Sequence, residues 1–240
     1  YNNFELKIIR LSVRKLWKIA KVLRAERFKH GSLDLNIPEV KIYVDRDGYA
    51  DSIESLEYDE SHQLIEEFML TANEAVAKSL RGYRIPLIYR VHDKPDPKKL
   101  EELQETLASY GLKTGNLINR KEMVTLIAKL NEHPQGHTLR IQFLRSLKQA
   151  CYRADPDGHF GLNMSDYTHF TSPIRRYSDL TVHRILDSFI TNQKKETLQK
   201  KNLLNYSKQN LTKLSQHLSL TEQNSNEAER SSVKVKLLEF

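Results

Sequence analysis

The sequence predicts an α+β fold that is mainly helical and contains a few short strands. Apolar residues recur at helical spacing in long segments, most clearly in residues 11–29 and 61–80. Strand-forming runs flank an Asp47-Gly48 step, which is typical of a β-hairpin. The chain has only 8 Gly and 7 Pro among 240 residues, a composition that excludes collagen-like and low-complexity proteins.

The first predicted helix, residues 11–29, carries the charge excess of the chain. Residues 1–30 contain nine Lys or Arg and two Glu, a net +7, whereas the remaining 29 basic and 29 acidic residues cancel. The basic residues fall on one face and Gly31 ends the helix. Such a face can attract RNA phosphates or anionic lipid, but for a charge run taken alone we favour a solvated face. The opposite, apolar face is formed by Leu11, Leu16, Ile19, Ala20 and Leu23.

The next elements follow from local signals. A hairpin is predicted from residues 40–44 and 49–53, then a helix over 61–80 and a strand over 85–91. Asp96 followed by Pro97 begins one helix, which Gly111 ends. Asn119 and Thr138 are predicted caps of helices reaching about residues 131 and 152.

The C-terminal third is predicted as a loop followed by helices. Residues 154–171 lack periodicity and are expected to form the loop, and Ser172-Pro173 is expected to begin a helix reaching about residue 191. The polar stretches 194–217 and 219–232 indicate further helices, and residues 234–240 the start of a strand. Because the chain opens at Tyr1 rather than Met, we expect residues 1–240 to be one domain truncated at both ends.

Composition also bears on location. No apolar run is long enough to cross a bilayer, so no membrane partner is expected. The single Cys151 cannot form an internal disulfide, which fits a reducing cytoplasm and excludes a cysteine-rich zinc site. The nine His show no metal-binding spacing, and His159, His169 and His183 are expected to be polar loop or helix residues. Nothing in the sequence indicates an obligate protein partner.

The segment 167–177 is the strongest candidate for chemistry. If Ser172 caps the following helix, Arg175 and Arg176 lie beside its positive end. Cations there are unfavourable by up to about 1 kcal/mol unless an anion is bound, so the arrangement is typical of a phosphate site. The alternative is a solvated ion pair of Arg175 with Asp179 one turn on, and the residues alone leave both interpretations open.

Two adjacent glutamates of the predicted 61–80 helix are expected to differ. Glu66 shares a mainly apolar face with Asn73, whereas Glu67 falls on an all-polar stripe and is expected to be solvated. A half-buried carboxylate at Glu66 requires a partner, and a ribose hydroxyl or an arginine would serve. An internal ion pair that only fixes packing is the alternative.

Five motifs, in this order along the chain, resemble the RNB-type catalytic domain of the ribonuclease II/R family. Their amino-acid sequences are closer to those of the ribonuclease R branch. They are KHGSLDLNIPEV (29–40), HQLIEEFMLTAN (62–73), YRVHDKP (89–95), GHFGL (158–162) and YTHFTSPIRRY (167–177). The resemblance spans essentially the whole chain and implies the C-terminal portion of that domain. The strands would then belong to an incomplete barrel.

The resemblance implies an enzyme that hydrolyses RNA phosphodiesters from the 3′ end and releases nucleoside 5′-monophosphates, with two Mg²⁺ ions as cofactor. The family's arginine that steadies the scissile phosphate falls on Arg175, with Arg176 as a neighbouring contact. The family's glutamates that contact the terminal nucleotides fall on Glu66 and Glu229.

One departure affects activity. The family's metal-binding aspartates, of the form D-x-x-x-x-x-D-x-D-D, have no counterpart in residues 1–240, so the Mg²⁺ ligands of the parent enzyme are not expected in this chain. We therefore predict that the polypeptide alone hydrolyses RNA poorly or not at all. The alternative is a non-catalytic relative that binds RNA or a protein without cutting.

Overall fold

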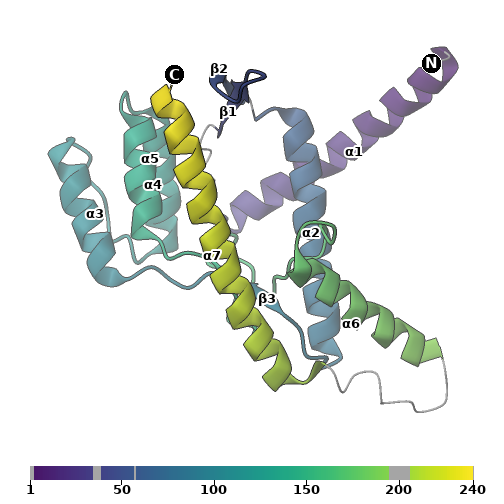
Figure 1. Cartoon of the computed structure of the whole chain (residues 1–240). Helices are drawn as coiled ribbons and strands as arrows, with labels where there is room; N and C mark the ends of the chain where they lie inside the picture. The colour runs from purple at the N-terminus through teal and green to yellow at the C-terminus, as the bar shows by residue number, and fades with distance from the viewer. Residues whose placement is uncertain (1–2, 35–38, 57, 195–205, 240) are drawn as a thin grey trace.

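The computed structural model describes residues 3–34, 39–56, 58–194 and 206–239. Within these residues the fold is α+β and mainly helical, as predicted (Figure 1). The strands form two separate two-stranded antiparallel sheets, β1–β2 and β3–β4, and the described part contains no closed barrel. The elements are α1 (Asn3–Lys29), β1 (Glu39–Val44), β2 (Ala50–Leu56), α2 (Glu60–Gly82), β3 (Tyr89–Val91), α3 (Pro97–Ser109), α4 (Arg120–Glu132), α5 (Gly136–Ser146), β4 (Cys151–Arg153), α6 (Tyr177–Lys194) and α7 (Lys208–Glu239).

Buried apolar residues of the described chain form two clusters. Helices α3, α4 and α5 pack together around side chains such as Leu107, Met123 and Phe143, all fully buried. The second cluster joins α2, α6, α7 and the β3–β4 pair. Figure 1 shows α3–α5 on one side of α7 and α2 with α6 on the other. Each fully buried Leu or Phe contributes about 1.5–3 kcal/mol to the free energy of folding, and the two clusters together help to offset the entropy lost when the chain is ordered.

Several predicted helix ends are confirmed. Asp96 caps α3 by accepting a hydrogen bond from the Lys98 backbone N–H at 3.0 Å, and Pro97 occupies the first turn. Asn119 caps α4 in the same way through Lys121 at 3.0 Å. Gly111, just past α3, has a φ of 77°, a left-handed conformation that glycine adopts without strain.

The hairpin is also as predicted, whereas the next strand is shorter. Ile42 lies opposite Ile53 in the β1–β2 register, and Gly48 at the tip has a φ of 86°. Of the predicted strand over 85–91, only Tyr89–Val91 pairs, with β4. This pairing places the segment before α3 next to the loop that follows β4.

Two predictions about the C-terminal half are wrong. Helix α5 begins at Gly136 without a side-chain cap, so Thr138 is not its cap, and Tyr152 lies in β4. Residues 234–239 continue α7 and do not begin a strand, because nothing in the polar run from 208 breaks the helix. Part of the predicted 194–217 helix lies outside the described residues.

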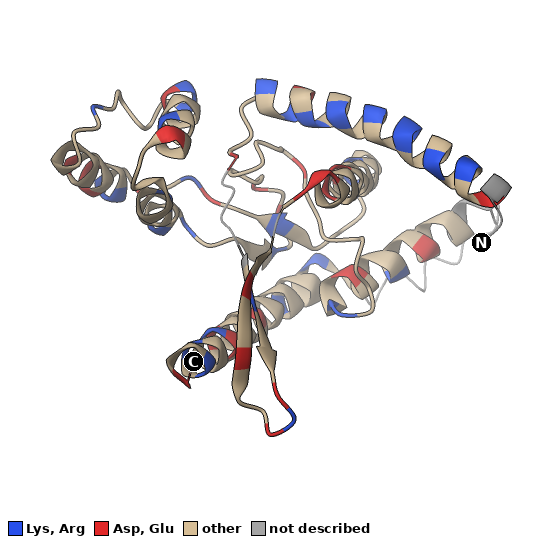
Figure 2. Ribbon diagram, turned by 90° about the horizontal axis from the view of Figure 1, so that it is seen from above, with Lys and Arg blue, Asp and Glu red and all other residues tan. Residues whose placement is uncertain are grey.

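Helix α1 leaves most of its expected apolar face exposed. Figures 1 and 2 show it extending away from the body, with Lys and Arg spread along it. Ala20 is fully buried, but Leu11, Leu16 and Ile19 of the expected apolar face are 42–50% exposed. Near its C-terminal end α1 contacts α2, and two of its arginines turn towards that helix. Within the described residues, no helix combines the length and apolar character needed to cross a membrane.

Candidate RNA-binding site

The predicted glutamate segment lies in the first half of α2. Asp59 caps this helix by accepting hydrogen bonds from the backbone N–H groups of Ser61 at 2.9 Å and His62 at 3.1 Å. Hydrogen bonds from these two residues, the Ser61 hydroxyl first, hold the pKa of Asp59 below its usual range. The cap fixes where α2 starts, and the helical spacing then places Glu66 on the same face as Met69 and Asn73.

The side chain of Glu66 lines a pocket of about 460 Å³, called here the Glu66 pocket. The α2 face supplies most of its wall, Tyr58 lines it from just before α2, and Tyr167 and Arg176 line it from the loop before α6. The Glu66 side chain is 37% exposed, and burial raises the pKa of its carboxyl above the usual value. The pocket thus combines a half-buried acid, an arginine and aromatic surface.

The expectation for Glu67 is wrong. Its side chain is only 2% exposed, because α1 covers that side of α2. Arg27 donates from Nε to both carboxylate oxygens, at 3.2 and 3.1 Å, and also pairs through Nη2. Arg24 adds an ion pair at 3.5 Å. Glu67 is therefore the buried, paired acid, and Glu66 the accessible one.

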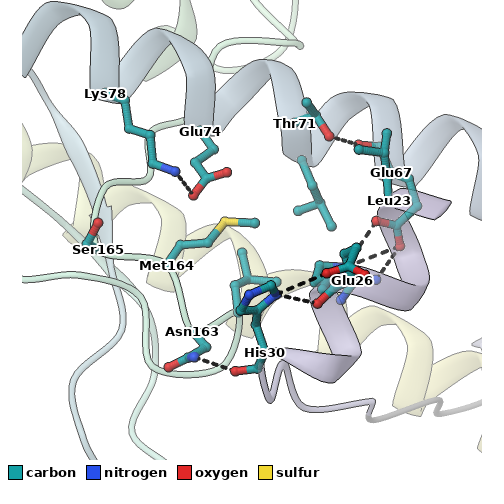
Figure 3. Close-up of a pocket in the computed structure, with 13 residues that line it drawn as sticks. Leu23, Glu26, His30, Glu67, Thr71, Glu74, Lys78, Asn163, Met164 and Ser165 are labelled. Atoms are coloured by element: carbon teal, nitrogen blue, oxygen red, sulfur yellow. Dashed lines mark hydrogen bonds and ion pairs between the residues drawn. The ribbon is translucent and has the colours of Figure 1, made fainter. Parts of the chain in front are cut away.

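Figure 3 shows a second pocket of about 500 Å³, on the Glu67 side of α2. Each of the three carboxylates that line it has a cationic partner. Glu74 pairs with Lys78 at 2.6 Å, Glu67 is held by Arg27, and Glu26 accepts from Lys29 at 3.3 Å. The Glu66 carboxylate has only looser ion pairs, at 3.5 Å with Arg24 and 3.8 Å with Arg27, so the Glu66 pocket is the stronger candidate site.

The loop between β4 and α6 is anchored on α2 by Asn73, whose side chain is 2% exposed. Its amide donates to the Tyr167 hydroxyl at 3.0 Å and accepts from the Phe170 backbone N–H at 3.0 Å. Thr168 donates to the Ile88 carbonyl at 2.6 Å, which ties the same loop to the strand region. These bonds fix the loop wall of the Glu66 pocket relative to its helical wall.

The start of α6 differs from the prediction. Residues 173–175 form a turn and the helix begins at Tyr177, so Ser172 is not its cap. Instead, the Ser172 carbonyl accepts from the backbone N–H groups of Arg175 and Arg176, at 3.3 and 3.1 Å, and its own N–H donates to Asp179 at 2.9 Å. The two arginines still immediately precede the first turn of the helix.

The two arginines have different surroundings. Arg176 pairs with Asp179, which is fully buried, at 2.8 Å, and its side chain is 19% exposed and lines the Glu66 pocket. The alternative ion pair of Arg175 with Asp179 is therefore not formed. Arg175 is exposed, and its side chain forms no hydrogen bond or ion pair within the described residues and does not line the Glu66 pocket.

Histidines of the neighbouring loop are packed against aromatic rings. Tyr152 and His169 share a hydrogen bond of 2.9 Å between Oη and Nδ1, and the His159 and Tyr167 rings meet edge-on with centroids 5.3 Å apart. Burial lowers the pKa of His159 to about 3. Burial also lowers the pKa of His169, and the positive charges of Arg176 and Arg175 lower it further. His183 donates to the Phe170 carbonyl at 2.8 Å, so all three have structural contacts.

Glu229 is not brought to this pocket. It lies exposed on α7, and its neighbour Arg230 lines a different pocket together with Arg90. Arg90 is tied to α7 by an ion pair with Glu222 at 2.5 Å. Glu229 therefore does not line the Glu66 pocket in the described structure.

The described residues do not form a metal centre. They contain no group of three or more His, Cys, Asp or Glu side chains arranged to hold a metal ion. Asp45 and Asp47 of the hairpin are used locally, since Asp45 accepts from the backbone N–H groups of Asp47 and Tyr49 at 3.0 and 2.8 Å. The described residues therefore do not fit the Mg²⁺ centre that the resemblance implies.

A protein-family model described as the RNB domain matches residues 3–192, more than half of the chain. The chain belongs to the RNB domain family. The resemblance found in the motifs is confirmed, and so is the fold class expected of an RNB fragment. Ribonuclease R of Thermotoga maritima is 37% identical over 226 residues, covering 93% of this chain and 31% of that protein.

Solved structures of RNB proteins agree. Mycoplasma genitalium RNase R in complex with ribose methylated single-stranded RNA superposes with a TM-score of 0.89 at 32% identity, covering 97% of this chain and 36% of that one. The complex of the same enzyme with double-stranded RNA gives 0.87, covering 95% and 40%. The chain therefore spans roughly a third of the length of these relatives.

Proposed function

We propose that this chain is the RNA-binding part of a 3′→5′ exoribonuclease that hydrolyses RNA phosphodiesters to nucleoside 5′-monophosphates. The observation that carries the proposal is the Glu66 pocket of an RNB-family chain, where an accessible carboxylate and Arg176 share one cavity. The RNB relative from Mycoplasma genitalium, which matches almost the full chain, is described in complex with single-stranded RNA.

In this proposal the arginines contact phosphate. Arg175 is exposed and free of ion pairs in the described chain, so its planar guanidinium is available for a bidentate contact with a phosphodiester. Arg176 is partly neutralised by Asp179, and its Nε has no hydrogen-bond partner in the described structure. Arg175 thus steadies the attacked phosphate and Arg176 supports a neighbouring one.

The glutamates are proposed to hold the terminal nucleotides. A carboxylate accepts hydrogen bonds only, which suits the hydroxyl groups of a ribose. Glu66 offers this from the pocket wall. Glu229 is the second proposed contact from the family pattern, and it would act from the surface of α7.

Hydrolysis itself is assigned to the whole protein. The parent enzyme would use Mg²⁺, with ligands supplied from outside these residues, and the described chain contributes substrate binding. A cytoplasmic location is part of the proposal and is supported by the single, unpaired Cys151.

The test measures RNA binding by the purified chain. Binding is monitored through the fluorescence anisotropy of a labelled single-stranded oligonucleotide, over a series of salt concentrations. Affinity should fall linearly in log–log form with salt, and Arg175→Ala should weaken binding and reduce the slope by about 0.7, the value for one phosphate contact on a single strand. Arg145→Ala is the matched control, because Arg145 is an exposed arginine in the last turn of α5. Unchanged affinity and slope in Arg175→Ala would contradict the phosphate role.

A nuclease assay completes the test. The chain alone with Mg²⁺ should leave the oligonucleotide intact or degrade it poorly. Robust exonuclease activity would show that the metal ligands are present after all, and RNA binding without any cutting by the full-length protein would favour a purely binding relative.

A further inference from the structure

We propose that Tyr58 is a positioning residue of the Glu66 pocket, whose hydroxyl holds the Glu66 carboxylate so that it selects an RNA 3′ end carrying a ribose. This inference rests on the proposed function of Glu66 as a contact to the terminal nucleotide. Tyr58 immediately precedes the α2 cap Asp59, and its hydroxyl donates a hydrogen bond to Glu66 Oε2. No motif in the sequence singles this tyrosine out.

The hydrogen bond matters because Glu66 has few other restraints. Arg27 is committed to Glu67, which it contacts from Nε to both carboxylate oxygens. Its distance to Glu66 is 3.8 Å, and that of Arg24 is 3.5 Å, so both interact with Glu66 only as loose ion pairs. Within the described chain, Tyr58 is the residue that forms a hydrogen bond with the Glu66 side chain.

The contacts reach both oxygens of the Glu66 carboxylate. The Tyr58 hydroxyl and the Arg24 guanidinium contact Oε2, and the Arg27 guanidinium lies 3.8 Å from Oε1. A carboxylate restrained at both oxygens presents its remaining lone pairs in a fixed direction. A fixed acceptor distinguishes a sugar that offers a hydroxyl donor from one that lacks it, since a 2′-hydroxyl is what separates RNA from DNA at a given site.

The position of Tyr58 is itself fixed. The Asp59 cap orders the backbone next to it through Ser61 and His62, and the Tyr58 and His62 rings lie 5.9 Å apart at an angle of 32°. Tyr58 is 38% exposed and lines the pocket, so its ring also offers a surface for a base. Substitution by Phe keeps this ring and removes only the hydroxyl.

The experiment measures the affinity of the purified chain for two single-stranded RNA oligonucleotides that differ only in a 3′-terminal ribose or 2′-deoxyribose. We expect wild type to prefer the ribose end and Tyr58→Phe to reduce this preference by roughly fivefold, the equivalent of about 1 kcal/mol, which is typical of one hydrogen bond. Affinity for the deoxy-terminated oligonucleotide should barely change. Tyr83→Phe, a 59% exposed tyrosine at the other end of α2, is the matched control.

A double-variant cycle with Glu66→Gln separates the two proposals. If Tyr58 acts through Glu66, adding Tyr58→Phe to Glu66→Gln should change the ribose preference no further. A wild-type chain without ribose preference would overturn the role of Glu66, and this inference with it. A wild-type preference that Glu66→Gln abolishes and Tyr58→Phe leaves intact would overturn the role of Tyr58 alone. Thermal unfolding of each variant checks that it is folded.

Discussion

The buried pair of Arg27 and Glu67 provides the sharpest test of the α1–α2 contact. Replacing Arg27 with Met keeps most of the side-chain length but leaves the Glu67 carboxylate, 2% exposed, without its bidentate partner. Removing one member of a buried ion pair typically costs about 3–5 kcal/mol. Arg24 lies 3.5 Å from Glu67 and can compensate in part, so we expect the lower end, about 3 kcal/mol.

For a chain of this length, about 3 kcal/mol corresponds to a melting temperature lower by roughly 6–12 °C. Urea unfolding followed by circular dichroism gives the free energy directly. Lys29→Met is the control, because the Lys29–Glu26 pair is exposed and should contribute under about 1 kcal/mol. The double variant Arg27→Met/Glu67→Leu should recover most of the loss, since it removes both charges. If Arg27→Met costs no more than Lys29→Met, the Glu67 carboxylate is not buried against Arg27 between α1 and α2.

Three further predictions concern stability. Because burial lowers the pKa of His159 to about 3, below the usual 6.5, the unfolded chain binds more protons in acid. Stability should therefore fall as pH drops below about 6.5, with His159 contributing about 2 kcal/mol between pH 7 and pH 5, and a urea series should show a weaker pH dependence in His159→Gln. Asp96→Ala should cost about 1 kcal/mol, measured the same way, and Asp96→Asn much less, because Asn also caps. Phe143→Ala should cost about 3–5 kcal/mol in thermal unfolding, and a loss under 1 kcal/mol would show that the α3–α5 core is not packed as described.

Local sequence signals predicted those parts of the fold that depend on local physics. Asp96 and Asn119 cap their helices because a short acceptor side chain reaches the free N–H groups of the next turn in any tertiary setting. The hairpin was predicted from Gly48 because its turn needs a positive φ, here 86°, which glycine adopts without strain. Thr138 and Ser172 carried the same kind of signal, but α5 begins at Gly136 and α6 begins at Tyr177. At Ser172, the backbone N–H donates a hydrogen bond to the side chain of Asp179, and the Ser172 carbonyl accepts within the turn that precedes α6.

The assignment of Glu67 to solvent failed for a different reason. A helical projection shows which residues share a face, but it does not show which face another helix covers. Glu67 is buried by α1, whose Arg27 is 40 residues away in sequence. A signal was present, since Arg24 and Arg27 follow Ala20 and Leu23 at helical spacing, so that two cations extend a stripe of apolar residues. Arginines in such a place indicate a buried acid on the partner helix.

We therefore propose different roles for the adjacent residues 66 and 67 of α2, one in ligand binding and one in packing. Glu67 is enclosed between two helices, and Glu66 faces a pocket open to ligand. A mutational survey of this stretch should sort the neighbours into separate phenotypes. Changes at 67 should lower heat tolerance and the yield of folded protein, whereas changes at 66 should leave both intact and alter which nucleic-acid ends the protein accepts.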